Sequence, residues 1–160
     1  MITPGVKRKP EEYEDPENLK ELDEVAAGKF RALAARANYL ALDRPDIGFA
    51  SKECCRHMAK PRKLDYENLR RLARYLRSNP RMTYQYPWRE SGEITAYVDA
   101  DFAGCIETRK STSGGCLLVG GHLIKHWSST QKTLALSSGE SELTGILKGT
   151  AEALSCQTSA

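Results

Sequence analysis

The sequence lacks the features that mark membrane-spanning, exported and disulfide-stabilised proteins. No apolar run approaches the roughly 18–20 residues that a membrane span requires, and the N-terminus has no apolar core of a secretory signal. The five cysteines are odd in number and show no CxxC or zinc-knuckle spacing. We therefore interpret the cysteines as reduced and mostly buried, and we expect an intracellular protein, cytoplasmic or nuclear, that is not secreted and binds no membrane.

Several catalytic and cofactor motifs are absent as well. The chain has neither a P-loop nor a GxGxxG sequence for nucleotide phosphates. Residues 139–143 do not form a GxSxG nucleophile motif, because Leu143 stands where the second glycine belongs. His122 and His126 are four residues apart on an expected strand with no third ligand nearby, which favours core or surface histidines over a zinc site. No small-molecule substrate is predicted.

Net charge is low for the whole chain but strongly uneven along it. The formal net charge is +3. Residues 31–90 carry fourteen Lys and Arg against six Asp and Glu, a net charge of +8, whereas residues 1–30 and 91–160 are acidic at −3 and −2. A basic segment followed by an acidic one suits a nucleic-acid enzyme, in which cations hold the backbone and carboxylates hold metal ions. A solvated arginine-rich surface explains the basic segment equally well.

The N-terminal half is predicted to be helical after a linker. Residues 1–25 are rich in proline and acidic side chains without an apolar period, so we predict a linker or extended arm. Residues 26–80 are predicted to form three helices, the first starting near Lys29. Pro45 disfavours a helical residue before it, and Asp46 caps the second helix. The residues expected to face inward from the first helix are Phe30, Leu33, Ala34, Ala37 and Leu40 or Ala41.

The third expected helix, over residues 66–77, has the clearest amphipathic pattern in the chain. Asp65 is expected to cap it. Its inward stripe consists of Leu69, Leu72, Ala73 and Leu76. The arginines outside this stripe are Arg70, Arg71, Arg74 and Arg77. We name these four as candidate nucleic-acid-binding residues, although solvated surface arginines are the favoured alternative for any single one of them.

The C-terminal half, residues 81–160, predicts strands followed by a helix. The expected strands cover residues 81–86, 93–98, 114–119 and 122–129. Gly120-Gly121 separates two β-type runs, which predicts a hairpin. One amphipathic helix packed on such a sheet gives an α+β fold.

The last helix is expected to begin at Ser137 or Ser138. Ser137 and Glu140 have the spacing of a capping box. The residues expected to give this helix its buried side are Leu143, Ile146, Leu147, Ala151 and Leu154.

Two acidic residues stand at positions that suit metal binding. Asp99 follows an apolar strand pattern, and Glu142 lies in the first turn of the last expected helix, where the helix dipole favours its ionised form. Carboxylates on separate rigid elements suit Mg²⁺, which completes its shell with water and phosphate oxygens. Spacing alone favours the alternative that Asp99 and Glu142 are ordinary turn and cap residues rather than metal ligands.

Four sequence segments, in their order along the chain, shift the balance toward the metal-binding interpretation of Asp99 and Glu142. They are Tyr97-Val-Asp-Ala-Asp-Phe-Ala-Gly, Arg109-Lys-Ser-Thr-Ser-Gly, His126-Trp-Ser-Ser and Ala135-Leu-Ser-Ser-Gly-Glu-Ser-Glu-Leu. Together they resemble the ribonuclease H domain of copia-type LTR retrotransposon Pol polyproteins. Residues 39–50 and 69–76 are similar to the segment that connects the reverse transcriptase to that domain. The resemblance covers roughly residues 25–155.

The resemblance implies a helical connection segment followed by the N-terminal half of a ribonuclease-H-like domain, with an antiparallel three-stranded start and the first helix. In that family four carboxylates hold two Mg²⁺ (or Mn²⁺) ions, and the site cuts the RNA strand of an RNA–DNA hybrid during reverse transcription. Asp99 and Glu142 match two of these acids and are implied as catalytic and metal-binding residues. Asp101 matches a position outside the metal set. The implied partners are an RNA–DNA hybrid or other nucleic acid and the remainder of the Pol polyprotein.

The chain departs from the family pattern toward its end. The third and fourth acids of the family follow later strands, whereas this chain ends at Ala160. We therefore expect weak metal binding and no nuclease activity from this chain alone. The leading alternative is a non-enzymatic remnant that binds nucleic acid through its basic residues or serves as an interaction module. A segment that never folds stably is a third possibility.

Overall fold

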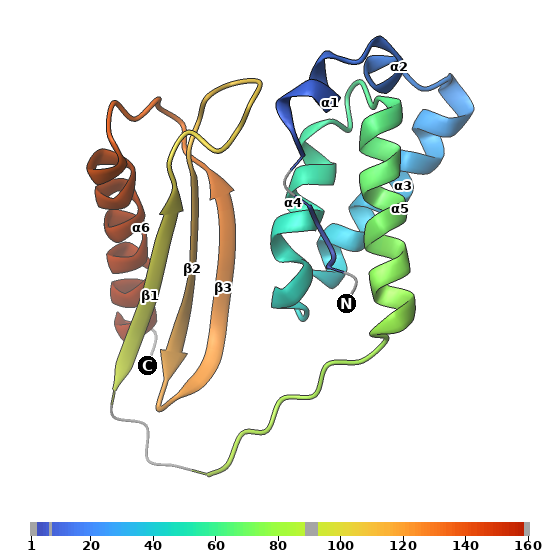
Figure 1. The fold of residues 1–160 in the computed structure, drawn as a ribbon. Coiled ribbons are helices and arrows are strands. Elements are labelled where there is room, and N and C mark those ends of the chain that lie inside the picture. Colours follow the sequence, from blue (N-terminus) through green and yellow to red (C-terminus); the bar gives the residue numbers. More distant parts are fainter. Residues whose placement is uncertain (1–2, 7, 89–92, 159–160) are drawn as a thin grey trace. The chain divides into compact units, whose positions relative to one another are not determined.

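The computed structural model describes residues 3–6, 8–88 and 93–158. The chain forms two compact units, Met1–Thr83 and Tyr84–Ala160, and each is described here by itself (Figure 1). None of the helices in these described ranges is long and apolar enough to cross a membrane.

The N-terminal arm of the first unit is partly helical and docked. It contains α1 (Pro10–Glu14) and α2 (Pro16–Leu19), each of which begins with a proline that is pre-organised for the first helical position. Further along, Glu21 forms an isolated antiparallel bridge with Arg62. The residues expected to form an extended linker are therefore attached to the body of the unit.

The body of the first unit consists of α3 (Glu24–Leu40), the short 3₁₀ helix η1 (Pro45–Ile47), α4 (Gly48–Arg56) and α5 (Lys63–Ser78). α3 begins five residues before the expected Lys29, because the Asp23 carboxylate caps it by accepting the Ala26 N–H at 2.8 Å. α5 also begins early. Asp65 is not its cap residue but lies inside the first turn, where its carboxylate accepts the backbone N–H of Arg62 at 2.8 Å.

The core of the first unit is formed mainly by small and medium apolar residues on three helices. The buried members are Ala27, Phe30, Ala34, Ala37, Ala41, Ile47, Ala50, Cys54, Leu64, Leu69 and Leu72. Two inward predictions are wrong, because Leu33 is 46 % exposed and Ala73 is exposed. On α3 the alanines face the neighbouring helices, so the helices approach closely and the larger Leu33 is left outside.

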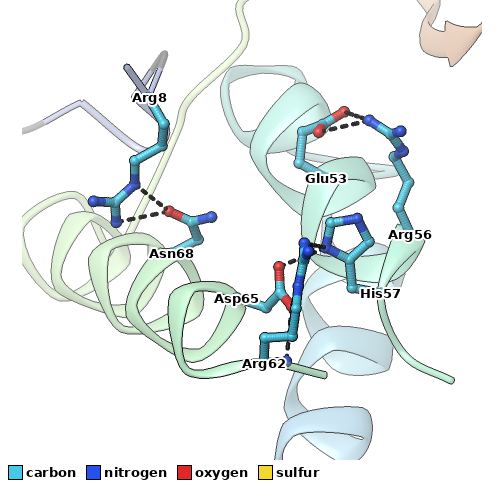
Figure 2. Close-up of polar contacts among 7 residues, drawn as sticks. All are labelled: Arg8, Glu53, Arg56, His57, Arg62, Asp65 and Asn68. Carbon is cyan, nitrogen blue, oxygen red and sulfur yellow. Dashed lines mark hydrogen bonds and ion pairs between the residues drawn. The ribbon is translucent and has the colours of Figure 1, made fainter. Parts of the chain in front are cut away.

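A buried carboxylate joins α4 to α5. Asp65 is 4 % exposed, with one oxygen 2.5 Å from His57 Nδ1 and the other accepting from Arg62 (Figure 2). Burial alone would raise the pKa of Asp65, but the hydrogen bonds from His57 and the Arg62 backbone outweigh it and hold this pKa below its ordinary value. Nearby, Arg8 of the arm donates to the Asn68 amide oxygen at 3.1 and 2.9 Å, which attaches the arm to α5.

Replacing this carboxylate should destabilise the first unit in a pH-dependent way. Asp65→Asn is expected to lower the unfolding free energy by about 3–5 kcal/mol near neutral pH, because it leaves the half-buried Arg62 guanidinium without its counter-charge. A depressed folded-state pKa contributes stability that is present above the unfolded pKa of about 3.9 and is lost as pH falls through the folded value. The difference between wild type and variant should therefore shrink with acidification.

Urea unfolding followed by far-UV circular dichroism from neutral pH to about pH 2 would measure this difference. The matched control is Asp43→Asn, which changes an exposed aspartate of the same unit. A constant gap between wild type and Asp65→Asn across that range would contradict the assignment.

The second unit is a three-stranded antiparallel sheet covered by one helix. The strands β1 (Ile94–Asp101), β2 (Thr112–Val119) and β3 (His122–Thr130) lie in the order β1-β2-β3, and α6 (Ser138–Thr158) packs on one face (Figure 1). This confirms the predicted α+β class and agrees with a partial ribonuclease-H-like domain. The strand expected over residues 81–86 is absent. Instead, the Tyr86 hydroxyl donates to the Leu123 carbonyl at 3.3 Å, and the side chain rather than the backbone anchors this segment.

The predicted hairpin between β2 and β3 is confirmed. Gly120 and Gly121 both have positive φ, at 56° and 82°, which is the conformation required of both central residues in a type I′ turn. Val119 pairs with His122 across the turn. A side chain at either glycine would be strained, so the Gly-Gly sequence sets the hairpin register.

The buried side of α6 is the opposite of the one predicted. Its buried residues are Ser141, Gly145 and Gly149. The residues expected inside are largely exposed instead, namely Leu143 at 56 %, Ile146 at 50 %, Leu147 at 64 % and Leu154 at 57 %. Apolar periodicity misassigned the face, because the helix approaches the sheet so closely that only small side chains fit between them.

This close approach makes a specific mutational prediction. A methyl group at Gly149 would overlap the Val98 side chain, whereas one at Gly145 would meet its nearest atoms at 3.8–3.9 Å, an ordinary contact distance. Gly149→Ala should therefore destabilise the second unit by about 1–3 kcal/mol through overpacking. Gly145→Ala should be neutral or mildly stabilising.

Thermal unfolding monitored by Trp127 fluorescence would compare the two variants, because the Trp127 ring lies next to Gly149. Equal unfolding temperatures for Gly149→Ala and Gly145→Ala would disprove the close contact between α6 and β1.

Candidate functional site

Asp99 lies near the C-terminal end of β1 with its side chain exposed. It pairs with Gly114 of β2. Its two neighbours face the helix, since a Cβ at Gly149 would meet Val98 and a Cβ at Gly145 would meet Ala100. Because successive side chains of a strand leave opposite faces, the Asp99 carboxylate leaves the sheet on the face away from α6.

Glu142 lies in α6 directly after its first turn, in which Glu140 is the acidic residue, and it is half-buried. Ser137 caps this helix, because its hydroxyl accepts the Glu140 N–H at 3.2 Å. The Glu140 carboxylate accepts from the Leu136 N–H at 2.6 Å rather than from Ser137, so the predicted capping box forms in one direction only.

The two acids stand at the same end of the unit. A Cβ built on Gly145 would lie 3.8 Å from the Asp99 carbonyl oxygen, so the helix contacts the strand one turn after Glu142. Glu142 is also four residues before Ile146, which lines the groove beside β1. Since β1 is an edge strand, its two faces meet around its free edge. The two acids nevertheless lie on opposite faces of the sheet, Glu142 on the α6 side and Asp99 on the open side.

The candidate donor set consists of the two carboxylates of Asp99 and Glu142. Among the residues that the structure describes, no three His, Cys, Asp or Glu side chains gather in a way that could hold a metal ion. Asp101 is held locally, because its carboxylate fills the space where a Gly104 side chain would stand. Two hard oxygen ligands fit a hydrated Mg²⁺ ion, which takes one or two protein carboxylates, but they do not make a complete two-metal site.

A buried glutamine that the sequence analysis missed positions the helix that carries Glu142. Gln131 is 6 % exposed, and its amide nitrogen donates to Ser113 Oγ at 2.9 Å and to the Ser141 carbonyl at 2.8 Å. Its backbone N–H donates to the Ser111 carbonyl at 2.8 Å. One side chain thus ties β2 to the residue directly before Glu142. No local sequence pattern distinguishes it from an ordinary polar residue at a strand end.

The four candidate arginines on α5 have different surroundings. Arg70 pairs with Glu67 at 2.7 Å, and Arg71 donates to the Thr3 carbonyl and hydroxyl at 3.1 and 2.9 Å. Arg74 and Arg77 are exposed, and within the described ranges neither has an ion pair or hydrogen bond. Arg74 and Arg77 are therefore the guanidinium groups of this set available to a phosphate, whereas Arg71 holds the arm.

The two tryptophans and the pair His122 and His126 lie in different surroundings. Trp127 packs against Gly115 and Gly149, whereas Trp88 is 97 % exposed. His122 Nε2 lies 3.0 Å from the Pro87 carbonyl, and His126 belongs to no metal-binding group in the part of the chain that the structure describes.

Comparison with known proteins identifies the family. The chain is 31 % identical over 124 residues to the retrovirus-related Pol polyprotein from transposon RE1 of Arabidopsis thaliana. It is 32 % identical over 123 residues to the uncharacterized mitochondrial protein AtMg00810 of the same plant. It is 31 % identical to the secreted RxLR effector protein 161 of Plasmopara viticola, covering 87 % of that protein. The chain belongs to the copia-type Pol polyprotein family.

The three relatives differ greatly in how much of their own length the matched segment covers. The similarity covers 77–78 % of this chain in all three cases, about half (51 %) of AtMg00810 and 8 % of the RE1 polyprotein. The chain thus corresponds to one segment of a polyprotein, and the rest of that polyprotein is its context. No family model and no solved structure matches the chain.

One of these relatives overturns the expected location. The lack of a signal-like N-terminus and the unpaired cysteines favoured an intracellular protein that is not secreted, but the Plasmopara viticola relative is named a secreted effector. Composition and cysteine spacing describe this segment only, so they do not determine where a protein containing it resides.

Proposed function

We propose that this chain is the start of the ribonuclease H domain of a Pol polyprotein, preceded by its connection segment. The parent domain would hydrolyse the RNA strand of RNA–DNA hybrids during reverse transcription. The observation that carries this proposal is the contact between α6 and the end of β1, which brings the elements bearing Glu142 and Asp99 to one end of the sheet. The order of the four motifs and the Pol polyprotein relatives support the same assignment.

In this proposal Asp99 and Glu142 are the first two metal ligands of the parent site. Bound Mg²⁺ ions would activate a water and stabilise the leaving 3′ oxygen. Gln131 would hold the first turn of α6 against β2, so that Glu142 keeps its position relative to β1.

The 160-residue chain by itself contributes two of the four carboxylates, so we propose that it binds a divalent ion weakly and cleaves nothing. Two ligands leave an ion mostly solvated, and no second ion would be held to stabilise the leaving group. Nuclease chemistry would then require further acids from another segment.

Metal binding provides the test of the two acids. Mg²⁺ or Mn²⁺ should raise the unfolding temperature of the wild-type chain in a concentration-dependent way, because a ligand that binds only the folded state stabilises it. Asp99→Asn and Glu142→Gln should each abolish the increase. Asp101→Asn is the matched control, since it removes an acid two residues along the same strand and should retain the increase.

An equal metal response in all three variants would refute the proposed ligands. Mg²⁺-dependent cleavage of an RNA–DNA hybrid by the chain alone, abolished by Asp99→Asn, would instead refute the proposed inactivity.

A second candidate function is nucleic-acid binding without catalysis. It is favoured by one observation, the exposed basic face of α5 with Arg74 and Arg77 free of ion pairs within the described ranges. Such a face would hold phosphates whatever the state of the acidic site.

Salt-dependent binding tests the basic face. The double variant Arg74→Gln with Arg77→Gln should weaken binding to an RNA–DNA hybrid and reduce the slope of log K against log salt by about one for each phosphate contact removed. Arg70→Gln is the control, because Arg70 already pairs with Glu67. Unchanged affinity and slope in the double variant, measured by fluorescence anisotropy, would contradict a role for this face.

A further inference from the structure

We propose that the N-terminal arm competes with nucleic-acid phosphates for the basic face of α5 and is displaced when a nucleic acid binds. The arm comprises the described residues 3–6 and 8–19, which lie along the N-terminal half of this helix. This inference rests on the second candidate function above, nucleic-acid binding by α5, and adds a regulation of that same surface.

The arm runs antiparallel to α5 and is held to it at three places. The contacts pair Thr3 with Arg71, Arg8 with Asn68 (Figure 2) and Glu17 with Lys63. None of the described residues of the arm is buried. A segment with few buried contacts opens at a low cost in free energy. The arm can therefore detach while the helices of the body stay folded.

Arg71 is held by Thr3 in the manner in which an arginine binds a phosphate. Its Nε donates to the Thr3 carbonyl at 3.1 Å, and its Nη2 donates to the Thr3 hydroxyl at 2.9 Å. Two donors on one edge of the guanidinium thus meet two oxygens, as they do in a bidentate pair with phosphate. The Thr3 oxygens are uncharged, so they satisfy these hydrogen bonds without compensating the positive charge. A phosphate offers the same two acceptors together with a negative charge.

This arrangement distinguishes Arg71 from its neighbour Arg70. The partner of Arg70 is Glu67, a carboxylate one turn earlier on the same helix, at 2.7 Å. That pair persists as long as α5 is folded, and the carboxylate compensates the charge of Arg70. The partner of Arg71 is 68 residues away in the sequence and belongs to the arm. Arg71 is therefore released whenever the arm detaches.

Lys63 is held by an acid of the arm. Its Nζ lies 2.5 Å from a Glu17 carboxylate oxygen, and the two side chains are 50 % and 63 % exposed. Residues 10–19 contain five Asp and Glu and no Lys or Arg, whereas α5 carries five Lys and Arg against two Asp and Glu. An exposed ion pair of this kind is weak and is screened by salt. The arm thus places a carboxylate where a nucleic acid would place a phosphate.

The end of the arm is attached to the body by the backbone. Directly after the arm, the Lys20 carbonyl accepts the Lys63 N–H at 2.9 Å, and the Leu22 N–H donates to the Pro61 carbonyl at 2.9 Å. These bonds keep residues 20–22 in place when the side-chain contacts of the arm are lost. A tethered competitor rebinds as an intramolecular partner at a high effective concentration. The arm therefore closes again once the nucleic acid has left.

Displacement of the arm would enlarge the basic face of α5. Arg71 and Arg74 are three residues apart and are therefore neighbours on the helix surface. Arg71 and Lys63 would add two cations to the exposed Arg74 and Arg77. Each further phosphate contact steepens the fall of log K with log salt by about 0.9, because counterions are released. The docked arm thus lowers both the affinity and its salt dependence.

A disulfide that locks the arm tests the proposal in the full chain. A Cβ built on Gly5 lies 3.4 Å from the Ala50 Cβ of α4, close to the roughly 3.5–4.5 Å that a disulfide spans. Gly5→Cys with Ala50→Cys should close this bridge under mild oxidation and keep Thr3 at Arg71. The oxidised form should bind a fluorescently labelled RNA–DNA hybrid about threefold or more weakly than the reduced form, with a salt slope lower by about one.

The control for the lock is Gly5→Cys alone, which lacks the bridging partner and should bind equally in both redox states. Mass spectrometry of non-reduced peptides distinguishes the engineered bridge from any bridge to a native cysteine. Failure of the bridge to form would contradict the docked position of the arm. Equal affinity and equal salt slope of the bridged and reduced forms would overturn the competition.

A charge variant tests the arm without new cysteines. Glu17→Gln should bind the same hybrid about two- to fivefold more tightly than Glu14→Gln, because it releases Lys63. Glu14→Gln is the matched control, since it removes the same charge from an exposed acid of the same arm and leaves the Lys63–Glu17 pair in place. Equal affinities of the two variants would also overturn the competition.

Failure of the underlying function gives a different result. If Arg74→Gln with Arg77→Gln binds as tightly as the wild type, α5 is not the nucleic-acid surface, and the role of the arm is refuted with it. If that variant loses affinity but neither the lock nor Glu17→Gln changes binding, only the regulation by the arm is refuted.

Discussion

The close contact between α6 and β1 is the constraint on which the second unit depends. Gly145 and Gly149 remove the side chains that would otherwise hold the helix away from the strand, and a Cβ at Gly149 would already meet Val98. This contact brings the helix turn carrying Glu142 to the end of the strand carrying Asp99. It also turns the large apolar side chains of α6 outward, so the same packing creates both the acidic end and the apolar groove.

Much of the architecture could be predicted from the sequence because its signals are local. The Gly120-Gly121 hairpin follows from the positive φ of a tight turn, and the α+β order follows from apolar periods of two and 3.6. The buried face of α6 could not be predicted in this way, because periodicity assumes that large apolar residues face inward. The hydrogen bonds of Gln131 could not be predicted either, since its partners come from two segments, one before and one after it in the sequence.

The candidate site, too, could be predicted from the sequence only in part. The order of the motifs pointed to Asp99 and Glu142. The face from which Asp99 leaves the sheet depends on which residues of β1 face α6, and the packing of the helix on the strand determines which residues these are. In the first unit, α5 carries the predicted arginines, but the docked arm occupies Arg71 and a local partner occupies Arg70. A helical pattern identifies a basic face without revealing which of its members are already bonded within the chain.

The two outer strands of the described sheet differ in how they are covered. The segment at Tyr86 and Pro87 contacts the start of β3, whereas the described residues add no strand beside β1 on the side away from β2. The unpaired backbone groups of β1 are a template for a further strand, so the sheet can be widened at β1 more readily than at the start of β3.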